Sequence, residues 1–387
     1  MVYEILFGKG KIKSGGVVKR RVMEHIDKLK LALSEELVEN NTTDFKQLLS
    51  QDVIMAFTMS KYVRVNEIKC DIQSGYTELA DVYSQAELDN HIPSLVVLPS
   101  TCTGVNAQPG VAESRLIIQD KASCFPSQIL FDEWLEKGGQ GDMVDACAAP
   151  GNKTSHLSAC VYDRSREDFR CRVFAFDRSP TRASLLQSRL SSAGARNVVV
   201  TEADFLEVDV TDSRYSDVRA LLADPSCSGS GVVRSLERVI EREGAGKTQA
   251  DDLNRRLENL RKFQIAAVTK CMTFPAAECV VYSTCSIHQE ENECVVAEIL
   301  RLHPEWDVKA PPRLSSWHRR GITTDGLTDS QASCLIRCMP EDGMNGFFVA
   351  LFVKRIPVKE NEDVEYTIGN CDRSTTNGTV CNTCQTR

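Results

Sequence analysis

The pattern of apolar and polar positions divides the chain near residue 140. Before that point, apolar residues recur at helical spacing over residues 17–37, and they alternate with polar residues over 61–66. These patterns predict a helix and a half-buried strand. A loop rich in Thr, Gly and Pro follows at 100–110, and the stretch from 113 through Gln119 to 135 predicts a helix. The first part of the chain is therefore a mixed α+β region.

After Asp142, short apolar runs alternate with helical patterns. The runs predict strands at 142–146, 172–177, 197–201, 220–224, 278–283 and 347–354. Helices are predicted between them, at 154–160, 181–193, 250–273 and 290–302. Strands that are separated by helices are typical of parallel βαβ units, so we expect an α/β fold with a doubly wound, mostly parallel sheet.

Three parts follow from these patterns: a smaller α+β region at 1–112, a doubly wound domain at 113–358 and a tail at 359–387. The tail has few apolar residues and is rich in Asn, Thr and Cys, so we expect it to be disordered. It holds three cysteines, Cys371, Cys381 and Cys384, but no histidine that could complete a closed zinc site. We therefore expect no metal.

Composition indicates a soluble globular protein. Charged residues make up 26% and hydrophobic residues 42%, and no apolar run reaches the roughly 20 residues of a membrane span. The start lacks the pattern of a secretory signal, so the 16 cysteines are expected to be reduced thiols rather than a disulfide framework. The net charge of −8 means that a nucleic-acid partner would need a local basic cluster; residues 1–30 carry eight Lys or Arg side chains against three acidic ones.

Polar turns close the predicted strands of the second domain. The first turn, residues 145–154, is made of small residues that allow close approach of the backbone to a ligand, and free amides at the following helix can bind an anion. Asp177 ends the second strand, where an acid can bind the hydroxyls of a ribose. Asp204 follows the third strand and could bind an adenine amino group. Asp224 ends the fourth strand, and three acids in equivalent positions indicate one site.

Two cysteines also follow strands. Cys227 lies in the turn Asp-Pro-Ser-Cys-Ser-Gly-Ser-Gly after the fourth strand, and Cys285 lies in Tyr-Ser-Thr-Cys-Ser after the fifth. A single cysteine is usually a small buried hydrophobe. Two cysteines in Ser/Thr-rich turns at one sheet edge indicate reactive thiols instead. The residues alone thus predict a cofactor-binding domain with two thiols, and the spacing does not rank them.

These four turns, in this order, resemble the Sun-domain RNA cytosine-5 methyltransferases, the class I RsmB/NOP type. Further blocks resemble the branch that methylates large-subunit ribosomal RNA. They are Tyr3-Glu4-Ile5-Leu6-Phe7-Gly8-Lys9-Gly10, Tyr62-Val63-Arg64-Val65-Asn66, Gln119-Asp120-Lys121-Ala122-Ser123-Cys124, Gln289-Glu290-Glu291-Asn292-Glu293 and Arg320-Gly321. In that family helical sequence usually precedes the first block, whereas here almost nothing does.

The resemblance implies a Rossmann-like class I methyltransferase that uses S-adenosyl-L-methionine and methylates carbon 5 of cytosine through a covalent cysteine adduct. It implies that Cys285 is the nucleophile, that Cys227 assists product release and that Asp224 contacts ring nitrogen 3. Lys153 is expected to be catalytic as well as cofactor-binding. The implied cofactor-binding residues are Cys147, Ala148, Ala149, Pro150, Gly151, Asn152, Lys153, Asp177, Asp204 and Asp224.

The expected partner is RNA, in large-subunit rRNA or a pre-ribosome, with residues 1–112 as the RNA-binding accessory region. We expect a monomer with no membrane contact, located in the nucleus and nucleolus or alternatively in the cytoplasm. Two other functions share the sequence features. One is methylation of transfer RNA by the same catalytic residues; the other is a non-catalytic ribosome-assembly factor that has kept the fold. A thiol redox or zinc protein is disfavoured, because no Cys-x-x-Cys lies in the βα turns.

Overall fold

The computed structural model describes residues 17–48, 58–233 and 250–355. Contacts group the chain into two units, residues 1–354 and 355–387. The tail predicted at 359–387 lies outside the described residues, and the predicted division at 112 falls inside the first unit.

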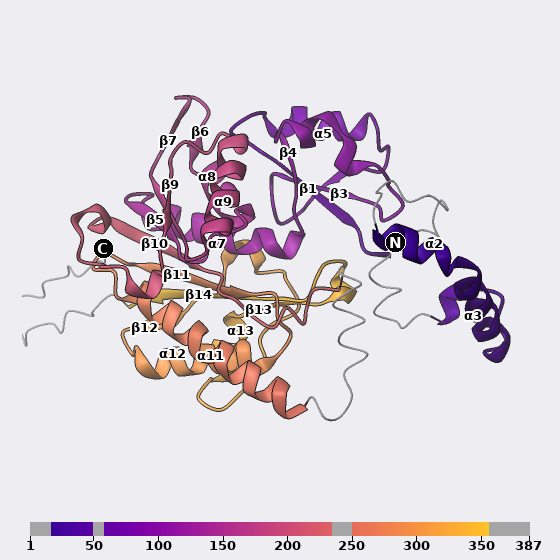
Figure 1. The fold of residues 1–387 in the computed structure, drawn as a ribbon. Helices are drawn as coiled ribbons and strands as arrows, with labels where there is room; N and C mark the ends of the chain where they lie inside the picture. Colours follow the sequence, from indigo (N-terminus) through magenta and orange to yellow (C-terminus); the bar gives the residue numbers. More distant parts are fainter. Residues whose placement is uncertain (1–16, 49–57, 234–249, 356–387) are drawn as a thin grey trace, which may run out of the picture. The chain divides into compact units, whose positions relative to one another are not determined.

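The first unit is built around an eight-stranded sheet (Figure 1). Its main path runs β12-β14-β11-β10-β5-β8-β9. These strands are Trp306–Val308, Phe347–Lys354, Cys279–Thr284, Val218–Ala223, Asp142–Asp145, Val173–Asp177 and Val198–Glu202. The five from β11 to β9 are parallel, whereas β12, β14 and the additional strand β13 (Ile336–Cys338) pair in antiparallel fashion. The six strands predicted between residues 142 and 354 are all present in this sheet, within two residues at either end.

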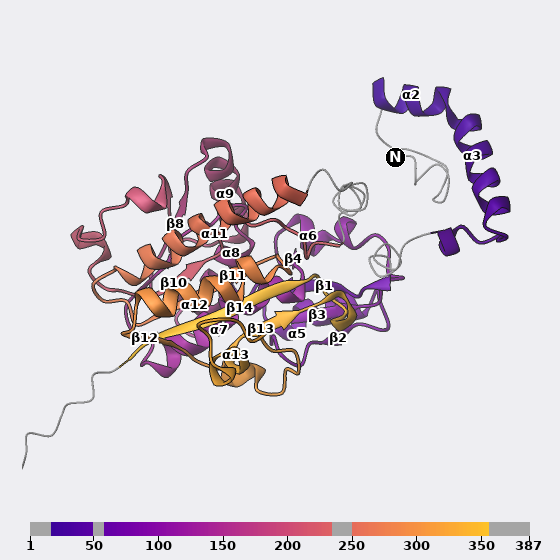
Figure 2. The same cartoon turned by 90° about the horizontal axis from the view of Figure 1, so that it is seen from below.

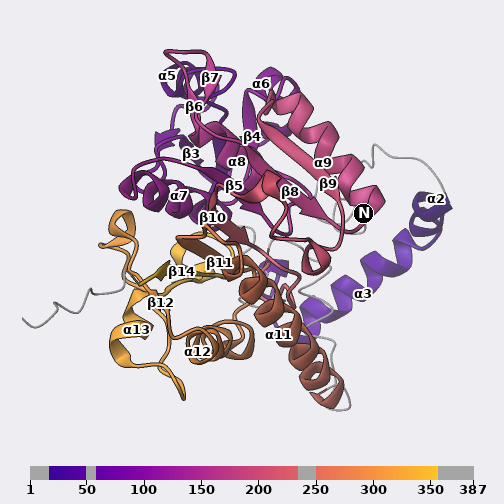
Figure 3. The same cartoon turned by 90° about the vertical axis from the view of Figure 1, so that its left-hand side faces the viewer.

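Helices cover both faces of this sheet (Figure 3). One face packs against α7 (Lys121–Glu136), α8 (Asn152–Cys160) and α9 (Pro180–Ala193), and the other against α11 (Ala250–Met272) and α12 (Glu293–Leu302). Alternate strand residues supply the two cores. Met143 and Val173 face α7, whereas Val144 and Phe174 face α11. The doubly wound prediction is therefore confirmed.

A second, antiparallel sheet has the order β2-β3-β1-β4. Its strands are Glu87–Leu88, Leu95–Leu98, Lys61–Val65 and Leu116–Ile118, and α5 (Ile72–Ala80) packs beside them (Figure 2). The helix predicted through residues 113–120 is wrong. Leu116–Ile118 pairs with β1 instead, so main-chain bonding across the sheet overrides the local helical pattern. Helix α7 begins only at Lys121, where the Asp120 side chain accepts a hydrogen bond from the amide of Ala122.

Two buried side chains of the Tyr62–Asn66 block join this small sheet to the large one. Arg64 donates to Gln119 and, at 2.9 Å, to the hydroxyl of Ser155 in α8. Asn66 donates to the carbonyl of Ala193 at the end of α9 and to that of Ser114. The block is therefore a structural link within the first unit.

The remaining described elements are short or lie at the chain's ends. Residues 17–39 form α2 (Val17–Glu24) and α3 (Ile26–Glu39), with a break at His25 inside the predicted helix. β6 (Tyr162–Asp163) and β7 (Asp168–Phe169) pair as a hairpin, and α13 (Asp329–Cys334) precedes β13. Among the described helices, none has both the length and the apolar character that crossing a bilayer requires.

Candidate active site

The predicted polar turns all lie at the carboxyl edge of the parallel strands. The turn 146–151 joins β5 to α8, and Asp177 is the last residue of β8. Asp204 lies two residues after β9, where its side chain caps the short helix η3 (Phe205–Glu207). Asp224 directly follows β10, and Cys285 directly follows β11. In an open α/β sheet this edge is where ligands bind.

The two cysteines meet at this edge. Their Sγ atoms are 3.2 Å apart, because β10 and β11 are neighbours in the sheet. The amide of Gly231 donates to the carbonyl of Cys285 at 2.9 Å, which ties the two turns together. The hydrogen bond with Cys285 and burial raise the pKa of the Cys227 thiol. Cys227 therefore favours its protonated form.

A lysine–aspartate pair lies at the same edge. The Lys153 ammonium donates to Asp224 Oδ2 at 2.7 Å and lies 5.2 Å from the ring centre of Phe347. The hydroxyl of Ser283 donates to Asp224 Oδ1 at 2.6 Å, so both carboxyl oxygens are held. Burial opposes the charge on Lys153, but the Asp224 carboxylate outweighs it and raises the pKa of Lys153. The Lys153 ammonium and the Asp224 carboxylate thus form a mostly buried, charge-assisted hydrogen bond with a fixed orientation.

The small-residue turn after β5 is fixed by packing against α9 and by a hydrogen bond between α8 and the end of β5. Gly151 has φ of +104°, which favours glycine, and an added Cβ would meet Leu186 at 2.9 Å. The hydroxyl of Thr154 donates to Asp145 Oδ2 at 2.7 Å. Burial raises the pKa of Asp145 to about 7, and burial likewise raises the pKa of the Cys147 thiol. Cys147 is therefore a neutral part of the turn rather than a nucleophile.

Arg182, which was not predicted as a site residue, links this turn to β8. Arg182, in the first turn of α9, donates to the carbonyl of Ala149 at 2.6 Å and lies 3.3 Å from Asp177 Oδ2. Asp177 Oδ1 accepts from the amide of Ser179. The turn and Asp177 are thus held in one arrangement.

A cavity of about 520 Å³ opens beside these residues. It is lined by Arg178 and Ser226, which are neighbours of the sheet-edge acids and Cys227, and by one side of α11. Those α11 residues are Arg255, Arg256, Asn259, Leu260 and Phe263. The volume is within the usual range for small-ligand sites, and the lining combines apolar and cationic side chains.

Several residues that hold the site were not predicted as site residues. Ser283 stands two positions before Cys285 in the same motif, so the motif could have suggested it. Phe347 and Arg182 come from distant segments, and no sequence signal connects them to Lys153 or Ala149. Glu291, which accepts two hydrogen bonds from Ser228, was noted only as part of a family block. In the described ranges, no group of three or more His, Cys, Asp or Glu side chains could hold a metal ion.

The strand order and the polar turns at the carboxyl edge define a Rossmann-like class I methyltransferase fold. Residues 133–353 match the family described as 16S rRNA methyltransferase RsmB/F, and the chain belongs to this family. The resemblance found in the sequence is thereby confirmed.

Similar proteins extend over most of the chain. It is 34% identical over 373 residues to a 28S rRNA (cytosine-C(5))-methyltransferase of Mus musculus, with 91% of this chain and 75% of the relative covered. It is 33% identical over 363 residues to a 25S rRNA (cytosine-C(5))-methyltransferase of Schizosaccharomyces pombe, with 90% and 75% covered. A methyltransferase homologue from Pyrococcus horikoshii has a similar fold, with a TM-score of 0.59, 20% identity, and 79% of this chain and 90% of that chain covered.

Proposed function

We propose that this chain is an S-adenosyl-L-methionine-dependent methyltransferase of carbon 5 of cytosine in large-subunit ribosomal RNA. The observation that carries the proposal is the pair of cysteine sulfurs, 3.2 Å apart, at the same sheet edge as the Lys153–Asp224 pair. Cytosine methylation at carbon 5 needs a thiol nucleophile and a group that stabilises the ring. The names of the mouse and yeast relatives support large-subunit rRNA as the substrate.

The residues at the edge fit an adenosyl cofactor. Asp177 and Asp204 offer carboxylates for hydroxyl and amino groups, and the small residues of the turn between β5 and α8 allow a ligand to approach the backbone closely. The cavity beside Arg178 and Phe263 has space for a nucleoside. In this proposal residues 147–153 and the two acids hold the cofactor, which supplies an electrophilic methyl group.

Cys285 is the proposed nucleophile. Its thiolate adds to carbon 6 of the cytosine, and the sulfur–carbon bond formed there makes carbon 5 electron-rich enough to take the methyl group. A base then removes the proton from carbon 5, the sulfur–carbon bond breaks, and the 5,6 double bond returns. The target base must leave its helical stack to reach the sulfur.

Asp224 and Lys153 are proposed to manage charge on the ring. Attack at carbon 6 places negative charge on the ring, and a proton at ring nitrogen 3 neutralises it. The Lys153 ammonium donates to Asp224 Oδ2, so the pair carries a proton that it can deliver toward the ring. Ser283 fixes the other oxygen and thereby the plane of the carboxyl group.

Cys227 is the proposed release residue. It directly contacts the sulfur of Cys285 and favours its thiol form, so it is suited to protonate the departing sulfur rather than to attack first. This assignment follows the family resemblance, and the geometry supports the contact on which it depends.

Bisulfite mapping of ribosomal RNA tests the function. Cells that lack the protein should lose one methylated cytosine in large-subunit rRNA, and the full chain should restore it, whereas a Cys285→Ala chain should not. Loss of a transfer-RNA mark instead would favour the transfer-RNA reading. Unchanged RNA with a phenotype rescued by Cys285→Ala would favour a non-catalytic assembly factor.

The same proposal includes location and partners. Large-subunit rRNA is made and modified in assembling particles, so we propose a nuclear, nucleolar protein that binds RNA. The basic cluster of residues 1–30 is the proposed electrostatic contact with phosphates. Binding by the full chain should weaken steeply as salt is raised, which a filter-binding titration measures.

A further inference from the structure

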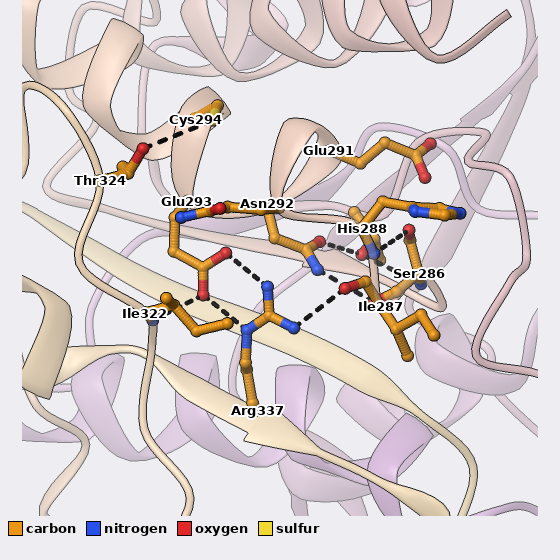
Figure 4. A network of polar contacts seen from close by, with 12 residues as sticks. Ser286, Ile287, His288, Glu291, Asn292, Glu293, Cys294, Ile322, Thr324 and Arg337 are labelled. Atoms are coloured by element: carbon orange, nitrogen blue, oxygen red, sulfur yellow. Dashed lines mark hydrogen bonds and ion pairs between the residues drawn. The ribbon is translucent and has the colours of Figure 1, made fainter. Parts of the chain in front are cut away.

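Three consecutive polar residues, Glu291, Asn292 and Glu293, are fully buried directly after the Cys285 turn. They close the short helix η6 (Gln289–Glu291) and open α12. Buried polar and charged side chains are normally hydrogen-bonded or paired, so we expect each of these residues to have specific partners. The side chains of Glu291 and Glu293 point away from each other (Figure 4). None of the three has a role in the chemistry proposed above.

Glu291 holds the turn that carries Cys227. Its carboxylate accepts from the amide and the hydroxyl of Ser228, at 2.8 and 2.6 Å. It also accepts from the side-chain amide of Gln264, at 3.0 Å, and Gln264 donates to the carbonyl of Ser226 at 3.1 Å. The residues before and after Cys227 are therefore both tied to one buried pair, Glu291 and Gln264.

Asn292 holds the turn that carries Cys285 in the same manner. Its side-chain oxygen accepts from the hydroxyl of Thr284 at 2.6 Å, and its side-chain nitrogen donates to the carbonyl of Ser286 at 3.0 Å. Thr284 and Ser286 are the residues before and after Cys285. Two residues that are adjacent in the chain therefore each fix the residues on both sides of one cysteine.

We propose that Glu291 and Asn292 are the positioning residues that set the two thiols against each other, with Gln264 assisting Glu291. The inference rests on the proposed function for the roles of the thiols, but the positioning itself does not need catalysis. A displacement of about 1 Å in a reacting group can lower a rate roughly a hundredfold, so rigid support of both sulfurs has a catalytic purpose. The roles are separable: Glu291 serves Cys227, and Asn292 serves Cys285.

The first experiment measures thiol placement in the absence of RNA. The full chain is treated with iodoacetamide, and the alkylation rates of Cys227 and Cys285 are measured by mass spectrometry. Glu291→Gln replaces one acceptor oxygen by a donor, so it should raise the rate at Cys227 roughly tenfold more than the rate at Cys285. Asn292→Ala should have the reverse preference.

Glu290→Gln is the matched control. Glu290 undergoes the same chemical change one position away, but its side chain is exposed. It should leave both alkylation rates at the wild-type values. Gln264→Met and Thr284→Val remove one partner on each side and keep the size of the side chain, so they repeat the two tests if Glu291→Gln or Asn292→Ala fails to fold.

The second experiment follows the covalent protein–RNA adduct on denaturing gels, with unmethylated large-subunit rRNA as the probe. Glu291→Gln should form the adduct and retain it, as loss of Cys227 would, whereas Asn292→Ala should slow adduct formation roughly tenfold or more. A defect of stability alone would lower both steps together.

The outcomes separate this inference from the proposed function. Selective alkylation changes support the positioning roles even if the wild-type chain methylates no RNA, a result that would overturn the proposed function alone. Equal changes at both thiols in the two variants, or rates equal to those of Glu290→Gln, would overturn the positioning roles. Adducts that accumulate in Asn292→Ala rather than Glu291→Gln would also overturn them.

Discussion

The Sγ atoms of Cys227 and Cys285 lie 3.2 Å apart, although 58 positions separate them in the sequence. Neighbouring parallel strands cause this approach, because each cysteine belongs to the turn at the carboxyl end of its own strand. The contact also affects titration, since the hydrogen bond with Cys285 is the largest cause of the raised pKa of Cys227. At neutral pH one proton therefore remains on Cys227.

Replacing each cysteine should give opposite defects. Cys285→Ala should abolish both methylation and the adduct, because it removes the proposed nucleophile. Cys227→Ala should form the adduct and hold it, because release lacks its thiol. Gel analysis of protein–RNA species, together with transfer of a labelled methyl group, measures both. The reverse pattern would exchange the roles of the two residues.

Lys153→Met should lower the single-turnover rate of methyl transfer by roughly a hundredfold or more, a typical loss for one electrostatic contact in an active site. Methionine keeps an apolar stem beside Phe347 but removes the ammonium that donates to Asp224. The matched control is Lys262→Met, which changes an exposed lysine of α11 that pairs with Glu258. A rate within about twofold of wild type would contradict the role of Lys153.

Asp145 should make the stability of the protein fall as the pH rises. Burial raises the pKa of Asp145 from 3.8 to about 7, so the folded state binds this proton more tightly than the unfolded state. The contribution to stability is greatest below pH 4, falls between pH 4 and about 7, and is then constant. At ~1.36 kcal/mol per pKa unit, the total loss is on the order of a few kcal/mol.

Asp145→Asn removes this titration and keeps an acceptor for Thr154. In urea unfolding at a series of pH values, the variant should gain stability relative to wild type as the pH rises from 4 to 7. Asp81→Asn, at an exposed position, should remain parallel to wild type throughout. Parallel curves for Asp145→Asn as well would show that Asp145 does not titrate in this range.

The strands along the chain and the edge of the site were predictable, because both depend on local features of the sequence. Apolar runs marked the strands, and the polar residues that end them are held at one edge by the parallel pairing. Asp224 and Cys285 were identified in this way. The residues 113–120 were mispredicted, because the pairing of Leu116–Ile118 with β1 depends on a partner about fifty positions earlier.

The supports of the site could not be predicted for the same reason. Phe347 lies beside Lys153 only because β14 folds back against β11, and Arg182 meets Ala149 only because β8 and β5 are neighbours in the sheet. The helix predicted at 290–302 begins at Glu293 instead. Asn292 has φ of −113° and ψ of −97°, a non-helical conformation that turns its side chain back toward the Cys285 turn. Asn292 belongs to a block that resembles the family, but the resemblance assigned no role to it.

The ion pair between Glu293 and Arg337 should be essential to the stability of the protein and of the turn that carries Cys285. Both side chains are buried, and they form two hydrogen bonds of 2.6 Å (Figure 4). Arg337 also donates to the carbonyl of Ile287, two residues after Cys285, and Glu293 accepts from the amide of Ile322. Glu293→Gln leaves a buried guanidinium without its counter-charge, so it should lower the free energy of unfolding by about 3–5 kcal/mol.

The double variant Glu293→Leu/Arg337→Met separates stability from positioning. Two apolar side chains of similar size leave no buried charge, so most of the lost stability should return in urea unfolding. Adduct formation should stay impaired, since the bond that holds the Ile287 carbonyl is still missing. Glu298→Gln, which breaks a surface pair with Arg301, should leave the urea unfolding curve close to that of wild type. If the double variant regained full adduct formation, the pair would act on stability alone and Arg337 would have no part in fixing the Cys285 turn.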